Sequence, residues 1–207
     1  MGALAPLLTG HARLQPRPPY APYRDPAAND AYNRLFGDTG EDALPHELAA
    51  LQTLAADENA EGTERYLAYA RLRRLKVPVP PRALLGVIVE LPGEGGLSVL
   101  AGYSHGTVRV LQPARPAALI VDMEHVTRKV RQLFAAARPA ITHIGPWARD
   151  RRRLPPPAQG TVRLSFLLSD GWYFGEGPRA TMEQGEMGGP IIHAALDLLR
   201  TVSALHV

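Results

Sequence analysis

Two groups of strand-like segments, separated by one amphipathic stretch, constrain the fold of this chain more than any other feature. The segment 84–91 is a compact run of apolar and β-branched residues, which predicts a buried strand. Further strands are predicted at 97–103, 107–111, 117–121, 161–168 and 172–174. The turn Ser104-His105-Gly106 is typical of a tight hairpin in which glycine supplies a positive φ, and Ser169-Asp170-Gly171 predicts a second hairpin turn. We therefore expect an antiparallel sheet of about five to six strands, built from a meander and a hairpin.

Apolar residues recur at helical spacing elsewhere, which predicts amphipathic helices. The predicted helices span 44–56, 62–76, 123–138 and 191–205. Prolines after Lys76 are expected to stop the second helix, and Pro139 is expected to end the third. Runs of strands separated by single helices are typical of α+β proteins, so we predict an α+β fold with its helices packed on one face of the sheet.

The chain of 207 residues is predicted to form one domain preceded by a tail. Residues 1–28 are rich in proline, which fixes φ and removes backbone donors, so this segment is expected to be a flexible tail. Residues 29–207 are expected to be a single α+β domain. Within it, 29–80 is the helical part and 82–207 the part that contains the sheet.

The absence of cysteine excludes disulfides, thiolate zinc sites and cysteine nucleophiles. A reducing cytoplasm is the simplest compartment for such a chain. No segment approaches the roughly 18 apolar residues needed to span a bilayer, so no membrane partner is expected. The formal charge is +3 and Lys76 and Lys129 are the only lysines, so the basic character comes from arginine. Such arginine use is typical of GC-rich genomes, which weakens any argument for nucleic-acid binding from charge alone.

The familiar catalytic and cofactor patterns are incomplete in this sequence. The glycine-rich loop 92–96 lacks the Lys-Ser/Thr pair of a P-loop and precedes a strand. The seven histidines form no H-x-H or H-x-x-x-H pair, so we predict no metal, no cofactor and no catalytic residue. An enzyme of unrecognised type is the alternative, with a hydrolase-like acid/base site around the 169–176 hairpin. Its candidate residues are Asp170, Glu176 and His193.

Two arginine clusters support a second alternative, a weak nucleic-acid binder. Arg71, Arg73 and Arg74 lie in the last turn of a predicted helix, where cations also complement the helix dipole. The second cluster, Arg151, Arg152 and Arg153, lies in a proline-rich connector. Both clusters are typical of solvated basic segments, so nucleic acid is not the expected partner.

Three consecutive aromatic residues, Trp172, Tyr173 and Phe174, are explained least by folding alone. Successive side chains of a strand point to opposite faces, so at least one of the three must face away from the buried side. Trp147, in a Gly-Pro break, and Glu176 are expected beside them. These five residues form the predicted partner-binding surface, with cover by the proline-rich tail as an equal alternative.

Several segments also resemble a family of hypothetical proteins from GC-rich bacterial genomes. They are Gly96-Leu97-Ser98-Val99-Leu100-Ala101-Gly102-Tyr103, Gly106-Thr107-Val108-Arg109, Ile144-Gly145-Pro146-Trp147 and Ser169-Asp170-Gly171-Trp172-Tyr173-Phe174-Gly175-Glu176-Gly177-Pro178. The resemblance spans about residues 30–205. Since that family has no known activity, the resemblance implies a bacterial protein and transfers no catalytic residue.

The sequence thus favours a bacterial protein that acts without catalysis by binding another protein. An accessory, regulatory or immunity-type factor fits this description. The sequence identifies neither the partner nor an oligomeric state.

Overall fold

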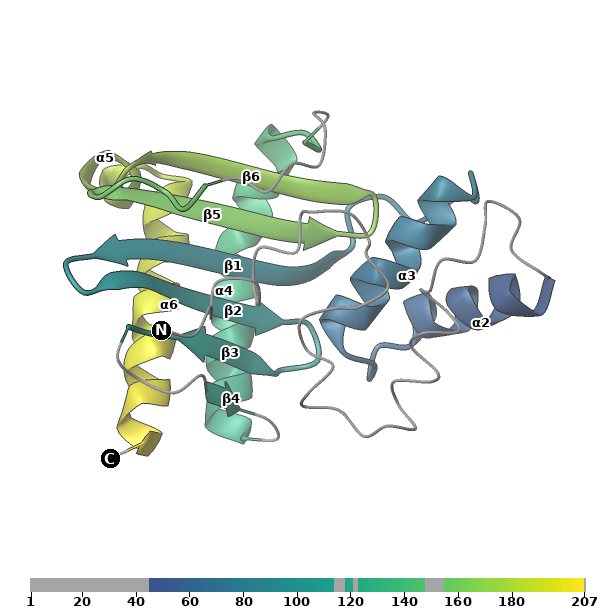
Figure 1. Cartoon of the computed structure of the whole chain (residues 1–207), viewed down its shortest axis with the longest axis horizontal. Coiled ribbons are helices and arrows are strands. Elements are labelled where there is room, and N and C mark those ends of the chain that lie inside the picture. The colour runs from purple at the N-terminus through teal and green to yellow at the C-terminus, as the bar shows by residue number, and fades with distance from the viewer. Residues whose placement is uncertain (1–44, 114–117, 121–122, 148–154, 207) are drawn as a thin grey trace.

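A six-stranded antiparallel sheet forms the centre of the molecule, and the predicted α+β fold is confirmed (Figure 1). The computed structural model describes residues 45–113, 118–120, 123–147 and 155–206. Across the sheet the strands follow the order β4-β3-β2-β1-β5-β6. Their bounds are β1 Leu84–Gly93, β2 Gly96–Tyr103, β3 Val108–Leu111, β4 Ala118–Ile120, β5 Thr161–Leu168 and β6 Gly171–Pro178. The predicted meander and hairpin are therefore parts of one sheet.

The meander and the hairpin meet where β1 pairs with β5. In this register Val87 lies opposite Phe166, and Glu90 lies opposite Arg163. Strand β1 pairs with β2 on its other edge, so it is a central strand whose side chains are buried on both faces. This position explains why its sequence is a nearly continuous apolar run and does not alternate.

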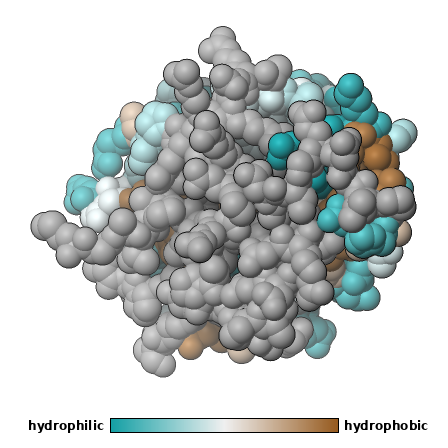
Figure 2. All heavy atoms as spheres, turned by 45° about the vertical axis from the view of Figure 1, so that its right-hand side comes forward, coloured by the Kyte–Doolittle hydropathy of each residue, from teal (hydrophilic) through white to brown (hydrophobic). Residues whose placement is uncertain are grey.

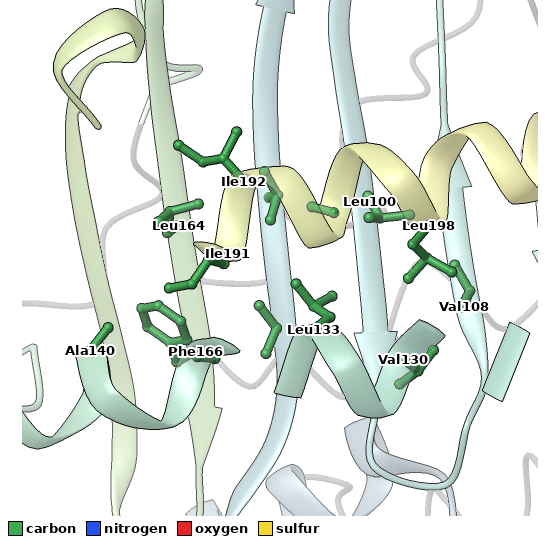
Figure 3. Close-up of a cluster of buried hydrophobic side chains, with 14 of the residues drawn as sticks. Leu100, Val108, Val130, Leu133, Ala140, Leu164, Phe166, Ile191, Ile192 and Leu198 are labelled. Atoms are coloured by element: carbon green, nitrogen blue, oxygen red, sulfur yellow. The ribbon is translucent and has the colours of Figure 1, made fainter. Parts of the chain in front are cut away.

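Two long helices cover one face of the sheet, α4 Glu124–His143 and α6 Gly188–Ser203 (Figures 1 and 3). Each helix turns an apolar stripe inward, and Val130, Leu133 and Leu198 are each at most 2% exposed. Their side chains pack against those of Leu100 and Phe166 from the sheet (Figure 3). This main core holds the largest group of buried apolar side chains in the described part of the chain.

A second, smaller core lies on the other face of the sheet. The helices α2 Pro45–Ala56 and α3 Gly62–Arg74 pack there against one end of the strands (Figure 1). The prediction that the helices share one face is therefore wrong, because Ile88, Val99 and Tyr103 give this face apolar residues of its own. A Cβ atom at Gly62 would lie 2.5 Å from the Leu85 carbonyl oxygen, so only glycine lets α3 start this close to β1.

Where Figure 2 leaves described residues visible, hydrophilic side chains predominate and hydrophobic ones form small groups. Hydrophobic groups of this size are ordinary on a protein surface. This side of the molecule therefore carries no extended apolar area among the residues that the view displays.

Pro139 does not end its helix, in contrast to the prediction. Helix α4 continues to His143, because Ala140 and Ile141 return to the main core one turn later. Because proline has no N–H, the carbonyl of Ala135 loses its helical donor. Ala135 and Pro139 are both exposed, so water can solvate this carbonyl. The Pro139 carbonyl oxygen itself accepts a hydrogen bond from the Thr142 hydroxyl at 2.7 Å.

The segment before α6 forms the short helix α5 Arg179–Gln184, where the sequence analysis predicted neither a helix nor a strand. Helix α5 has no buried residue, so it lacks the apolar spacing by which longer helices are recognised in a sequence. A Cβ atom at Gly188 would lie 2.6 Å from the Met182 carbonyl oxygen. Glycine at this position therefore permits the tight approach of α6 to α5.

The predicted tail 1–28 lies outside the described residues.

Candidate functional site

Strand β6 divides its three consecutive aromatic side chains between the two faces of the sheet, as the alternation of a strand requires. Tyr173 points into the main core and is 1% exposed. Trp172 and Phe174 point to the opposite face and are half-buried. The prediction that at least one of the three turns away from the main core is confirmed. Tyr173 therefore does not lie on the surface predicted for partner binding.

No described helix crosses the outer face of β5 and β6, which we call the helix-free face (Figure 1). Helices α4 and α6 lie on the other side of the sheet, and α3 lies beyond one end of these strands. Along β6 this face carries the side chains of Trp172, Phe174 and Glu176 in succession. Their partners across β5 are Leu167, Ser165 and Arg163.

Trp147 joins the two aromatic residues on this face to form the aromatic patch, defined as Trp147, Trp172 and Phe174. The ring centroids of Trp147 and Phe174 are 4.6 Å apart, and those of Trp172 and Phe174 are 5.0 Å apart. The two indoles lie edge to face at 6.4 Å. Such distances and tilts are those of attractive aromatic pairs.

The backbone of Trp147 is held directly against the edge of β6. Its N–H donates to the Trp172 carbonyl oxygen at 2.8 Å. Pro146, the preceding residue, packs on Gly171, where a Cβ atom would lie only 3.0 Å from the proline ring. The Gly-Pro break after α4 therefore positions Trp147, and the expectation that Trp147 lies beside the β6 aromatics agrees with this geometry.

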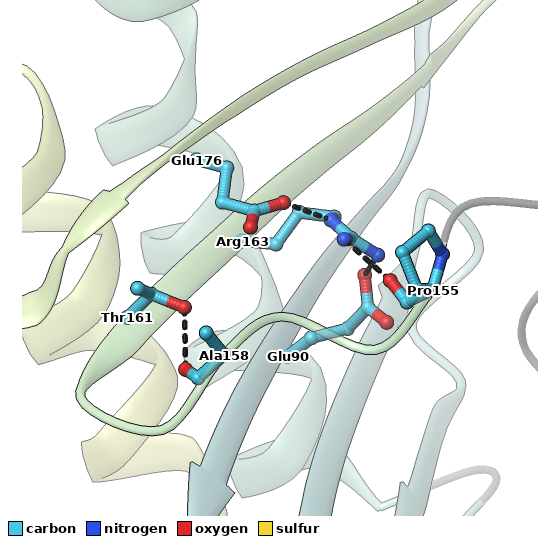
Figure 4. A network of polar contacts seen from close by, with 6 residues as sticks. All are labelled: Glu90, Pro155, Ala158, Thr161, Arg163 and Glu176. Atoms are coloured by element: carbon cyan, nitrogen blue, oxygen red, sulfur yellow. Dashed lines mark hydrogen bonds and ion pairs between the residues drawn. The ribbon is translucent and has the colours of Figure 1, made fainter.

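A buried ion-pair network lies next to the aromatic patch on the same face (Figure 4). Arg163 donates through Nε to Glu176 Oε2 at 2.7 Å and through Nη1 to Glu90 Oε2 at 3.3 Å. Its Nη2 group donates to the Pro155 carbonyl oxygen at 2.7 Å. The Arg163 side chain is 3% exposed and that of Glu90 is 5% exposed, so both charges are almost fully removed from water. A charge this buried requires such partners.

Burial raises the pKa of Glu90 above its ordinary value, because desolvation outweighs the opposing attraction of Arg163. Its second oxygen, Oε1, has no hydrogen-bond partner among the described residues. The buried hydroxyl of Ser165, beside the network, also lacks a partner there. The sequence analysis missed Glu90 and Arg163, although Glu90 is the one charged residue in the run 84–91.

The proline-rich connector returns to the sheet at this network. Pro155 accepts the hydrogen bond of Arg163 (Figure 4). Pro157 is buried. The Thr161 hydroxyl then donates to the Ala158 carbonyl oxygen at 2.6 Å and begins β5. The described end of the connector is thus bound to the protein's own sheet. Arg151, Arg152 and Arg153 lie outside the described residues.

The three residues suggested for an acid/base site lie apart. Asp170, in the β5–β6 turn, accepts a hydrogen bond from the Tyr173 hydroxyl at 3.0 Å, and burial together with this carboxylate raises the pKa of Tyr173. Glu176 lies near the far end of β6 in the Arg163 network. His193 is exposed on α6, which packs on the opposite face of the sheet. These three side chains therefore do not converge on one cavity.

The helical arginine cluster is not a single exposed stripe. Arg71 is 8% exposed, and Arg73 donates to the Ser169 carbonyl oxygen and lies over the Tyr66 ring. Arg74 is the exposed member of the three. The cluster therefore helps to attach α3 to the sheet, and only part of it faces solvent.

His105 has a structural role that the sequence did not suggest. Its Nδ1 accepts a hydrogen bond from the Gly62 N–H at 3.1 Å, at the start of α3. Burial lowers the pKa of His105, which favours the neutral ring that this acceptor role requires.

The side chain of Asp197, which lies four residues after His193, bonds to Lys129 of α4, and that hydrogen bond lowers the pKa of Asp197.

Within the described residues, no group of three histidine or acidic side chains is placed to hold a metal ion. Among those same residues, no helix combines the length and apolar character needed to cross a membrane. No protein-family model matches the chain, and no curated protein matches it. The resemblance to bacterial proteins from GC-rich genomes stays a prediction.

Proposed function

We propose that this chain is a non-catalytic binding protein that recognises another protein through the aromatic patch on its helix-free face. An accessory, regulatory or immunity-type role in a bacterial cytoplasm is the setting that we propose for it. The carrying observation is the position of Trp147, Trp172 and Phe174, which form a half-buried aromatic group at one edge of the sheet.

Aromatic side chains at this position are suited to binding. Tryptophan supplies a large apolar area with few rotatable bonds, and it is enriched among the residues that dominate binding energy in interfaces. The patch is also held rigidly, by mutual ring contacts and by the Trp147 backbone hydrogen bond. A preformed surface loses little conformational entropy when a partner binds.

The main core does not explain the place of this group, although Trp172 also packs against the second core. Tyr173 already fills the position of β6 that faces α4 and α6, so Trp172 and Phe174 contribute nothing to that core. Aromatic residues next to a charged and polar network also match the composition of a binding surface, with an apolar centre and a polar rim.

The acid/base alternative receives no support from the positions of its residues, because Asp170, Glu176 and His193 lie in three separate environments. The nucleic-acid alternative is weakened in the described cluster, where Arg71 is buried and Arg73 is bound to the Ser169 carbonyl oxygen. A protein partner therefore remains the proposal.

A capture experiment tests this function. The intact chain, immobilised and exposed to extract of the organism that encodes it, is expected to retain one protein in stoichiometric amount. The variants Trp172→Ala and Phe174→Ala are expected to lose most of it, since truncating a central aromatic typically lowers affinity by about tenfold or more.

Leu205→Ala is the matched control, because Leu205 is an exposed apolar residue, 39% accessible, that follows α6. It is expected to retain the captured protein at the level of the unchanged chain. Circular dichroism and thermal unfolding establish that each variant is folded. Equal capture by all four proteins, or capture of nothing by the unchanged chain, contradicts the proposal.

A further inference from the structure

Strand β6 is an edge of the sheet, and its main-chain groups alternate in direction. Arg179, just after the strand, donates its N–H to the Gly160 carbonyl oxygen before β5, and Gly171 pairs with Leu168 across the two-residue turn. Tyr173, Gly175 and the other odd-numbered residues of β6 therefore direct their N–H and C=O groups toward β5. The even-numbered residues direct theirs away from the sheet.

Trp147 provides independent support for this direction. Its N–H donates to the carbonyl oxygen of Trp172, an even-numbered residue, from the outer side of β6. By the same alternation, Phe174 and Glu176 present two N–H donors and two carbonyl acceptors outward. No hydrogen bond to these four groups is found in the described part of the chain.

Apart from the Trp147 contact at Trp172, the described part of this edge carries few of the features by which proteins usually prevent strand addition. Proline first occurs at Pro178, where β6 ends, and the strand carries no lysine. The Glu176 carboxylate is bonded to Arg163. Between Phe174 and Glu176 lies Gly175, and no atom of the described residues lies within 4 Å of the place where its Cβ would be.

We propose that the partner adds an extended segment to β6 as a seventh strand, through main-chain hydrogen bonds to Phe174 and Glu176. This inference rests on the proposed function and specifies how the partner is held. Strand addition of this kind obtains affinity from the main chain and specificity from alternate side chains. Trp147 already bonds to Trp172 on the outer side of β6. The added segment therefore pairs with β6 from Phe174 onward.

The side chains of the helix-free face define the chemistry of the segment. The residue that lies beside Phe174 is apolar, because it contacts the aromatic patch. The residue beside Glu176, two positions away on the same face, is lysine or arginine. In the network one arginine, Arg163, is paired with two carboxylates, and the Glu176 side chain is 32% exposed, so a cation is favoured there.

A second copy of this chain does not fit the same edge in the register centred on Gly175. Two β6 strands paired antiparallel about Gly175 would place Pro178 of the second copy beside Trp172. The backbone of Trp147 already occupies that position. Pairing about Glu176 would avoid Trp147 but would place the two Glu176 carboxylates directly opposite each other, which is unfavourable. The segment that we propose therefore belongs to a different protein.

The probe for this inference is a phage-displayed library of random peptides about ten residues long, enough for a strand of typical length. Peptides enriched on the intact chain are expected to carry an apolar residue and, two positions away, lysine or arginine. Enrichment is expected to disappear on Phe174→Ala. Methylating a peptide amide that faces β6 is expected to lower affinity about tenfold, whereas methylating the next amide, which faces away, leaves it within about twofold.

Amide hydrogen exchange tests the edge itself. In the free protein the Phe174 and Glu176 amides are expected to exchange fast and those of Tyr173 and Gly175 slowly, and bound peptide is expected to slow the first pair. Strand addition is overturned if peptides that need the aromatic patch for binding leave the exchange of the Phe174 and Glu176 amides fast. That result leaves the proposed function standing. Slow exchange of both amides in the free protein, or self-association that protects them, also overturns strand addition. Enrichment that survives Phe174→Ala and Trp172→Ala counts against the proposed function instead.

Discussion

The two faces of the sheet are built differently. The face under α4 and α6 is apolar from end to end, and its central side chains, such as Leu133 and Ile191, are fully buried. On the helix-free face of β5 and β6, one arginine paired with two carboxylates lies beside a half-buried aromatic patch. The first face needs only packing to be stable. The second combines a buried charge, which packing does not require, with half-buried aromatic side chains.

The largest expected effect comes from the charged network. Arg163→Met leaves Glu90 buried without its counter-charge, and this is expected to lower the free energy of unfolding by about 3–5 kcal/mol. Urea unfolding measures the change. Adding Glu90→Gln to Arg163→Met removes the unpaired charge and is expected to recover most of the loss. If Arg163→Met alone costs nothing, the network does not stabilise the helix-free face.

A core truncation on the helix-covered face has the next largest effect. Leu133→Ala is expected to lower the free energy of unfolding by about 2–5 kcal/mol, because the side chain is 0% exposed and leaves a cavity. Gln132→Ala, at the exposed neighbouring position of α4, is the control and is expected to change it by less than about 0.5 kcal/mol. Partner binding by the folded Leu133→Ala protein should be unchanged. A loss of binding without a loss of folding would contradict the claim that the helix-covered face serves stability and the helix-free face serves binding.

Truncation of the aromatic patch is expected to cost less stability than truncation of the core. Phe174→Ala removes ring contacts that are half solvated, so we expect a loss of about 1 kcal/mol in the free energy of unfolding. Capture of the partner should nevertheless fall strongly. A stability loss as large as that of Leu133→Ala would place Phe174 in the core and remove the contrast between the faces.

The smallest effect is a difference in pH dependence. The pKa of Glu90 is raised in the folded state, so the folded protein holds this proton to a higher pH than the unfolded chain does. The contribution of Glu90 to stability is therefore greatest below its ordinary pKa of 4.5 and falls as the pH rises through the folded value. In Glu90→Gln this fall is absent. Unfolding measured from about pH 4 to pH 7 should show the variant gaining stability relative to the unchanged chain, and a relative loss would contradict the burial argument.

Local patterns in the sequence predicted the strands well, because each strand carries its own signal. The run 84–91 indicated a central strand, and the glycine turns indicated the hairpins. The pairing of β1 with β5 has no local signal, since it joins residues about 75 positions apart, as Glu90 and Arg163 are. Pro139 misled the prediction because the loss of one helical hydrogen bond at an exposed position was offset by the packing of the residues beyond it.

The candidate site was only partly predictable for the same reason. Alternation along β6 required the aromatic residues to face both ways, but only the main core determines that Tyr173 is the buried one. Arg163 looked like an ordinary polar residue of an alternating strand. Its role depends on Glu90 and Glu176, which lie on the two neighbouring strands, and the sequence alone does not bring these three together.

The most direct test of the account uses the two tryptophans of the chain, which are Trp147 and Trp172. Both belong to the aromatic patch, so the intact chain labelled with fluorotryptophan reports on the patch alone. Titration with the captured partner, followed by fluorine NMR, is expected to shift both signals in step with binding. Saturation with the partner while both signals stay in place would contradict the claim that the aromatic patch is the binding surface.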